Sequence, residues 1–174
     1  APLLVAVFTI PFVVRGLGTD RFGLLAIAWV VLGYFNLFDL GLGRATTKYV
    51  AEAFGKGGED QVPAIIWTAV SVQAAMGLLG TIVLWAITDL LVDEVLNIPA
   101  ELLEEARLTF HLLSLSIPII LTSSSFSGAL EAAQRFDLLN AVRIPTSILT
   151  YLLPLLGLSL GLGLPGIVAL ILLA

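Results

Sequence analysis

The sequence contains no cysteine, one histidine and few charged residues. Charged side chains make up 12% of its 174 residues, whereas soluble domains carry about 25%. Without cysteine the chain forms neither disulfide bonds nor thiolate metal sites. It also lacks a phosphate-cradling glycine-lysine motif and any metal-ligand spacing. We therefore expect no metal, no cofactor and no hydrolysis of ATP by this chain.

Basic residues are scarcer than acidic ones, and hydrophobic residues dominate. Eight Lys and Arg stand against thirteen Asp and Glu, giving a net charge of -5, which argues against a nucleic-acid partner. Hydrophobic residues make up 59% of the chain, and the mean hydropathy is +1.06. A bundle whose perimeter faces lipid needs charge only at its ends. The composition therefore predicts an integral membrane protein.

Five long stretches contain no charged residue: 1–14, 22–38, 61–88, 108–130 and 144–174. A spanning helix needs about 20 residues. The second stretch reaches that length if Asp39 sits at a membrane boundary and the helix continues through Leu42. The last is too long for one helix, and its glycines and Pro165 are typical of a tight hairpin. We predict an all-α polytopic transmembrane bundle of about six helices, at residues 1–14, 22–42, 63–88, 106–130, 144–160 and 166–174.

The first and last predicted helices are short. Residues 1–14 would cover only about 21 Å of a hydrocarbon core that is about 30 Å thick. Since no initiator methionine or basic region precedes them, a signal peptide is not expected. We expect the chain to be a piece of a larger protein, truncated within the helices at 1–14 and 166–174.

The basic residues are divided unequally between the two predicted sides of the membrane. One side carries Arg44, Lys48, Lys56, Arg135 and Arg143. The other carries Arg15, Arg21 and Arg107. Because cytoplasmic loops hold an excess of Lys and Arg, this distribution favours a cytoplasmic N-terminus. The acidic segment 89–105 is then expected outside.

Polar residues occur within two of the predicted spans. In residues 63–88, Gln73 shares one helix face with the small residues Ala69 and Gly77, which suits either close helix packing or the lining of a substrate path. In residues 106–130, Pro118 frees a backbone carbonyl in mid-membrane and should kink the helix. For His111, a pH-sensitive or substrate-contacting role and a hydrogen-bonded position near the outer interface both remain open.

Asp39 stands at the end of the second predicted span. An ionisable residue at that depth is a functional candidate, for substrate or cation handling. The alternative is that Asp39 marks the boundary and pairs with a basic residue of a neighbouring helix. Arg44, Lys48 and Glu52 follow at steps of four residues, which indicates a charged edge on a helix that continues into the cytoplasm.

Four motifs occur in order along the chain: Pro11–Leu24 around Arg-Gly-Leu-Gly, Asp39–Gly43, Asn97–Glu101 and Gly128–Asn140. Together with the hydropathy, they resemble the O-antigen type of oligosaccharide and polysaccharide flippases, in the multidrug/oligosaccharidyl-lipid/polysaccharide exporter superfamily. The resemblance implies a transporter of two pseudo-symmetric lobes, of which this chain is the first, in the inner cell membrane. It implies export of polyprenyl-diphosphate-linked oligosaccharide from the inner to the outer leaflet by alternating access, for cell-surface polysaccharide. The implied partners are the lipid-linked oligosaccharide, membrane lipid and the second lobe.

The resemblance also assigns candidate residues. Arg15 lies in the loop after the first helix, Asp39 in the Asp-Leu-Gly motif and Arg135 in the Gln-Arg-Phe-Asp loop, and the last two motifs are expected to serve a cytoplasmic gate. The diphosphate needs cationic partners. Candidates for substrate binding are Arg15, Asp39, Arg44, Lys48 and Arg143. Candidates for the gate or cavity are Gln73, His111, Pro118 and Arg135.

Three alternatives remain at this point. A multidrug or small-molecule antiporter of the same superfamily would need a carboxylate deep in the lobe. A membrane-embedded enzyme acting on lipid-linked sugars would need an acidic or histidine group at a substantial loop, for which the sequence offers only the acidic run around 101–105. A purely structural scaffold is the third alternative.

Overall fold

A computed structural model describes residues 2–37, 39, 41–96 and 98–173. These residues form helices and turns and contain no strand, so the predicted all-α architecture is confirmed. The α-helices are α1 (Pro2–Leu17), α2 (Thr19–Leu37), α3 (Leu42–Gly55), α4 (Val62–Leu90), α5 (Leu103–Ala132), α6 (Phe136–Ser159) and α7 (Leu164–Leu172).

Among the residues that the structure describes, three helical segments are long and apolar enough to cross a membrane: Glu59–Val95, Ala100–Ala132 and Phe136–Ser159. They contain α4, α5 and α6. Val5–Leu17, within α1, is a shorter apolar helix. The membrane character expected from the composition is therefore present in the folded chain.

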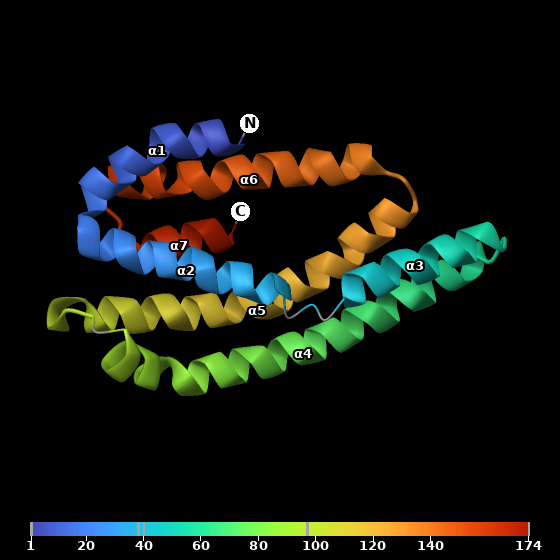
Figure 1. The fold of residues 1–174 in the computed structure, drawn as a ribbon, viewed down its shortest axis with the longest axis horizontal. Coiled ribbons are helices and arrows are strands. Elements are labelled where there is room, and N and C mark those ends of the chain that lie inside the picture. The colour runs from blue at the N-terminus through green and yellow to red at the C-terminus, as the bar shows by residue number, and fades with distance from the viewer. Residues whose placement is uncertain (1, 38, 40, 97, 174) are drawn as a thin grey trace.

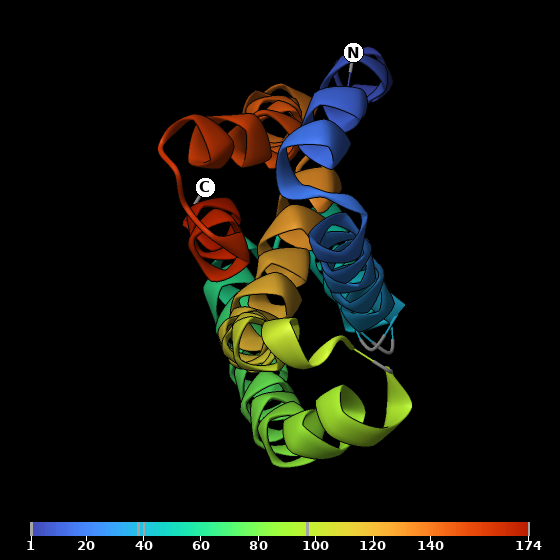
Figure 2. The same cartoon turned by 90° about the vertical axis from the view of Figure 1, so that its left-hand side faces the viewer.

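Helix α5 is the centre of the bundle. It contacts α2, α3, α4, α6 and α7, and α2 and α7 lie on opposite sides of it (Figure 2). Helix α4 runs along α5, and α3 packs on both of them at one end (Figure 1). Helix α1 packs along α6, so that α1 and α6 form an outer layer beyond α2 and α7.

The connections gather at two ends of the bundle (Figure 1). The turns α1–α2, α4–α5 and α6–α7 share one end, here called the acidic end because it holds the segment 89–105. The turns α3–α4 and α5–α6 lie at the other, here called the basic end. Which of the two faces the cytoplasm stays a prediction.

The hydrophobic core is concentrated at the acidic end. Phe110 and Leu113 of α5 are fully buried there against Leu25 of α2 and Ile167 of α7. Ion pairs close the same end: the carboxylate of Glu105 lies 2.8 Å from Arg21 and accepts a hydrogen bond from the backbone N–H of Leu164, at 2.7 Å. Glu105, on α5, is thereby bonded to both α2 and α7.

The second predicted helix differs from the observed one. It was expected to continue through Leu42, but α2 ends at Leu37 and a separate helix, α3, begins at Leu42. Gly41 between them has a φ of 79°, which L side chains rarely adopt. The backbone carbonyl of Asp39 accepts a hydrogen bond from the N–H of Leu42, at 2.8 Å, in a turn that precedes the separate helix α3. Leu40 lies outside the described residues.

Helix α6 also differs, because it begins at Phe136 rather than near residue 144. The prediction excluded Asp137 and Arg143 because they are charged. Both side chains are exposed. A helix tolerates a charged side chain where water can solvate the charge. The other predicted boundaries differ from the observed ones by a few residues.

Pro118 lies at a close contact between α4 and α5. Proline has no N–H, so the carbonyl of Ser114 loses its helical donor. The hydroxyl of Thr81, on α4, donates to that carbonyl at 2.8 Å. A Cβ atom on Gly77 would lie 2.4 Å from Cα of Pro118, so only glycine lets the helices approach this closely. The freed carbonyl is thus satisfied by a neighbouring helix, and α5 bends along its length (Figure 1).

We predict that Thr81→Val destabilises the protein, because the Ser114 carbonyl then has no donor in an apolar environment. The expected loss is about 1–2 kcal/mol of unfolding free energy, measured by thermal or denaturant unfolding of the purified protein in detergent. Thr81→Ser keeps the donor and serves as the control. Equal stability of Thr81→Val and the wild type would contradict this role.

Candidate functional site at the basic end

Asp39 is held by hydrogen bonds rather than by an ion pair. Its carboxylate accepts the backbone N–H of Gly43 at 3.0 Å and the side-chain amide of Gln73 at 2.5 Å. The sequence suggested a basic partner from a neighbouring helix, and no salt bridge to Asp39 occurs in the part of the chain that the structure describes. The contact with Gly43 satisfies one of the free N–H groups in the first turn of α3.

Gln73 connects Asp39 to the central helix. Its side chain is fully buried, and its amide oxygen accepts a hydrogen bond from the buried hydroxyl of Ser125 on α5. Asp39, Gln73 and Ser125, here called the polar junction, therefore join the turn after α2 to α4 and α5. Burying these groups in a membrane bundle is tolerated because each finds a partner.

Two glycines bring α3 against α5 beside the polar junction. A Cβ atom on Gly128 would lie 2.5 Å from the backbone oxygen of Gly43. A Cβ atom on Gly43 would overlap the hydroxyl of Ser124. Sequence reasoning named both glycines within motifs but gave them no role, since a close approach between distant segments is visible only in three dimensions.

The exposed face of α3 carries the basic residues. Arg44 and Lys48 are exposed, and neither forms an ion pair among the described residues. The ammonium group of Lys48 lies 5.6 Å from the ring centre of Tyr49. Lys56, in contrast, donates to Glu52 at 2.5 Å and, by this hydrogen bond and its charge, lowers the pKa of that carboxyl group.

The first half of α6 is uncovered at the basic end. Residues 140–146 are all exposed. Asn140, Arg143, Ser147 and Thr150 follow at steps of three or four residues and so form one polar face, here called the α6 polar face. The hydroxyl of Ser147 donates to the backbone oxygen of Arg143 at 2.7 Å, which leaves its lone pairs free to accept.

The remaining candidates are distributed along the bundle. Arg135, between α5 and α6, contacts Asp137 at 3.1 Å, and this hydrogen bond raises the pKa of Arg135. Arg15 lies in the last turn of α1, at the acidic end of the bundle, and is exposed. His111 is half-buried in α5 and stacks on Trp85 of α4, with 4.2 Å between ring centres.

The structure therefore brings together only part of the predicted set. Asp39 and Gln73 are in direct contact, and Arg44 and Lys48 lie on the helix that follows Asp39. Arg135 and Arg143 belong to the α5–α6 region of the same end. Arg15 lies at the opposite end, and His111 and Pro118 lie along α5.

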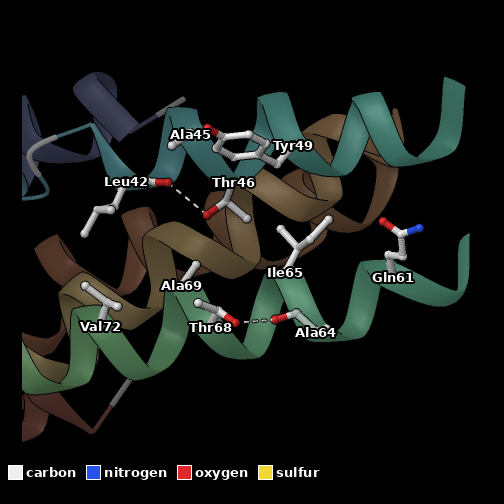
Figure 3. A pocket seen from close by; sticks show the side chains of 10 residues that line it. All are labelled: Leu42, Ala45, Thr46, Tyr49, Gln61, Ala64, Ile65, Thr68, Ala69 and Val72. Carbon is white, nitrogen blue, oxygen red and sulfur yellow. Dashed lines mark hydrogen bonds between the residues drawn. The ribbon is translucent and has the colours of Figure 1, made fainter. Parts of the chain in front are cut away.

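An open groove of about 490 Å³ runs between α3 and α4 (Figure 3). Its lining is largely apolar, with Leu42 and Val72 at one end and Tyr49 and Gln61 toward the other. The sequence gave no signal for it, because the groove depends on how α3 and α4 pack against each other.

These features define a polytopic membrane helix bundle that is packed at its acidic end and uncovered at its basic end. The sequence matches the MatE family over residues 4–155, and the chain belongs to this family. This membership confirms the resemblance found in the sequence at the level of the family.

Two relatives extend the comparison. The chain is 29% identical over 139 residues to a protein of Shigella flexneri named "Putative O-antigen transporter", covering 80% of this chain and 32% of that protein. It is 23% identical over 141 residues to "Uncharacterized membrane protein EpsK" of Bacillus subtilis (strain 168), covering 81% of this chain and 28% of that protein. The chain thus spans about a third of the length of the curated relatives it matches. No solved structure matches it.

We predict that the polar junction acts as a unit in stability. Gln73→Leu keeps the side-chain volume but leaves the Asp39 carboxylate and the Ser125 hydroxyl without their shared partner, at a cost of about 1–3 kcal/mol. Adding Ser125→Ala to Gln73→Leu should cost little more, because the hydroxyl already lacks its partner. Unfolding of the two single variants and the double variant in detergent measures this non-additivity.

Ser71→Ala, at an exposed position of the same helix, is the control and should leave stability unchanged. Strictly additive losses from Gln73→Leu and Ser125→Ala would show that the junction does not exist as a connected network.

Proposed function

We propose that the whole protein is an exporter of polyprenyl-diphosphate-linked oligosaccharide, moved from the inner to the outer leaflet by alternating access for cell-surface polysaccharide. In this proposal the chain forms the first of two lobes, and the second belongs to the same polypeptide. Membership of the MatE family and the name of the Shigella flexneri relative support a transporter of polysaccharide precursors.

The observation that carries the proposal is the α6 polar face. Arg143 lies about 10 Å along α6 from its first residue, in a segment apolar enough to span a membrane, yet it is exposed. An arginine in such a segment must face water, a counter-charge or both. A diphosphate supplies the counter-charge, and guanidinium groups bind phosphate with charge-assisted hydrogen bonds.

The neutral members of this face suit the sugar part of such a substrate. Asn140 both donates and accepts hydrogen bonds, and the hydroxyl oxygens of Ser147 and Thr150 accept. Sugars present many hydroxyl groups that donate and accept in the same way. A cation flanked by such side chains therefore fits a cargo with an anionic link and a polar saccharide.

Other candidates complete the proposal at both ends. Arg44 and Lys48 are exposed and form no ion pair among the described residues, so each can offer a cation to an anionic head group at the basic end. Arg15 is the candidate that the cargo would meet at the acidic end.

The gate is proposed at the Asp39 turn and at the Arg135 loop. The polar junction fixes the start of α3, so a movement of α3 requires these hydrogen bonds to rearrange. Gln73 and Pro118 belong to the packed interior that carries this movement, and His111 lies nearer the acidic end.

The structure does not favour the multidrug alternative. That function would need a carboxylate deep in the lobe, whereas Asp39 lies in a turn and is occupied by Gly43 and Gln73.

We predict that Arg143→Ala lowers the initial rate of translocation about tenfold or more, as expected from the loss of a charge-assisted contact worth about 1.5–3 kcal/mol. The assay uses the full-length protein in liposomes with a fluorescent lipid-linked oligosaccharide. Lys56→Ala is the matched control, since Lys56 already pairs with Glu52. Translocation by the wild type no faster than in empty liposomes would refute the function. An unchanged rate in Arg143→Ala would refute the role of the α6 polar face.

We further predict that Asp39→Asn and Arg44→Ala impair export of surface polysaccharide in cells while the protein still inserts into the membrane. Polysaccharide at the cell surface and protein in the membrane fraction are measured together. An equal fall in protein abundance in both variants would assign these residues to folding instead.

A further inference from the structure

The contact between α4 and α5 follows a regular series of positions. Every fourth residue of α4, and of the segment Leu91–Val95 that continues it, meets a residue of α5. The series comprises Gln73, Gly77, Thr81, Trp85, Asp89 and Asp93, which meet Ser125, Pro118, Ser114, His111 and Arg107 of α5. This series, here called the α4–α5 seam, runs from the polar junction to the acidic end.

His111 is the titratable side chain of the seam within the apolar part of both helices. Residues 61–88 and 108–130 contain no Asp, Glu, Lys or Arg. Its imidazole ring stacks on the indole of Trp85, with 4.2 Å between ring centres and 28° between the planes. Because histidine is the side chain that gains or loses a proton between pH 5 and 8, the charge at this position depends on the pH of the medium.

The stack lies at a membrane interface, where water supplies protons. Trp67 and Trp85 are 65% and 50% exposed and are separated by about 27 Å along α4, close to the spacing of the two aromatic belts. Trp85 is the one toward the acidic end, and His111 beside it is half-buried. The imidazole is therefore within reach of water on the acidic side of the membrane.

The charged group nearest along the seam is a cluster with more carboxylates than cations. Arg107, one turn from His111, is bonded to three carboxylates: Asp89 at 3.4 Å, Asp93 at 2.7 Å and Glu104 at 3.2 Å. An imidazolium at His111 would thus lie beside a guanidinium whose charge is more than balanced.

The other elements at this end do not reverse that balance. Helix α7 contains no titratable residue, and Arg21 of α2 pairs with Glu105, which lies on another face of α5, about 120° around the helix from His111. Seven carboxylates of the acidic end stand against three guanidinium groups. They belong to Asp20, Asp89, Asp93, Glu94, Glu101, Glu104 and Glu105, against Arg15, Arg21 and Arg107.

A proton on His111 would strengthen the contact between the helices. A cation within about 6 Å of the centre of a tryptophan ring is attracted by the negative face of the ring, whereas neutral imidazole only stacks. The next position of the seam is joined to this one, because the hydroxyl of Ser114 donates to the carbonyl of His111 at 2.7 Å and the carbonyl of Ser114 accepts from Thr81. A change at His111 therefore acts next to the bend at Pro118.

We propose that His111 and Trp85 form a pH-sensitive contact that holds α4 and α5 together at the acidic end. At pH values below the titration of histidine, the imidazolium binds the indole face and the contact is strongest. As the pH rises toward 8, the proton passes to water and this contribution is lost. Opening of the acidic end then depends on the pH of the medium at that side. This contact does not rest on the proposed transport function.

Local opening of this end is measured by labelling a buried cysteine with a thiol reagent. Thr88→Cys, at a fully buried position of α4, is placed in full-length protein that is otherwise free of cysteine. His111→Phe keeps an aromatic stack but binds no proton. At pH 5.5 it should raise the labelling rate about threefold, and at pH 8 it should leave the rate unchanged. The ratio of the two rates at each pH cancels the pH dependence of the thiol itself.

Two tryptophan variants locate the effect. Trp85→Leu should abolish the pH dependence of this ratio, because the imidazolium then has no ring to bind. Trp67→Leu, at the opposite belt of the same helix, is the matched control and should leave the dependence intact. Equal ratios at pH 5.5 and pH 8, or the same loss in Trp67→Leu as in Trp85→Leu, would overturn the proposal.

Histidine NMR tests the same contact with the native side chains in place, so the result does not depend on a variant that misfolds. In full-length protein with isotope-labelled histidine, the His111 signal is assigned by its absence from His111→Phe. It should move between pH 5 and 8 and carry the ring-current shift of the Trp85 indole. A signal that stays fixed over this pH range would contradict the proposal.

Discussion

The requirement that every buried polar group find a partner inside the protein governs this bundle, because lipid offers none. At the centre of α5, Pro118 removes a backbone donor and Thr81 of α4 replaces it at the Ser114 carbonyl. At the basic end the Asp39 carboxylate receives the donors of Gly43 and Gln73. Both solutions depend on close helix approach, which small residues such as glycine permit. The polar contacts among α3, α4 and α5 therefore depend on the tight packing of these three helices.

The two ends of the bundle are built differently, and this difference determines which end has uncovered surface. The acidic end is closed by a hydrophobic core and by Glu105, which binds Arg21 and the backbone of Leu164. At the basic end α6 leaves the bundle and exposes residues 140–146 on all sides. The polar junction holds only α3, α4 and α5 there. In the function proposed above, cargo and a second lobe would both contact this uncovered surface.

Much of the fold follows from the sequence because charge is expensive in a membrane. The uncharged runs located α4 and α5 closely, and the carbonyl that Pro118 was expected to free accepts a hydrogen bond from Thr81. The same rule failed at α6, where exposed charges continue the helix to Phe136. It also failed at Asp39, where a left-handed Gly41 precedes a new helix and the Asp39 carboxylate accepts a hydrogen bond from the N–H of Gly43. Asp39 and Gln73 were each singled out, but their contact is long-range, and the α3–α4 groove likewise depends on packing that no local pattern shows.

The central claim is that the α6 polar face borders water within the membrane-spanning part of the protein. Single cysteines placed along α6 of the full-length protein in native membranes test it with a small, membrane-impermeant thiol reagent. The account predicts that Asn140→Cys, Arg143→Cys and Ser147→Cys are labelled, while Val142→Cys, Leu149→Cys and Leu152→Cys are protected. Labelling that is uniform along the helix, or protection of the polar positions together with the apolar ones, would contradict it.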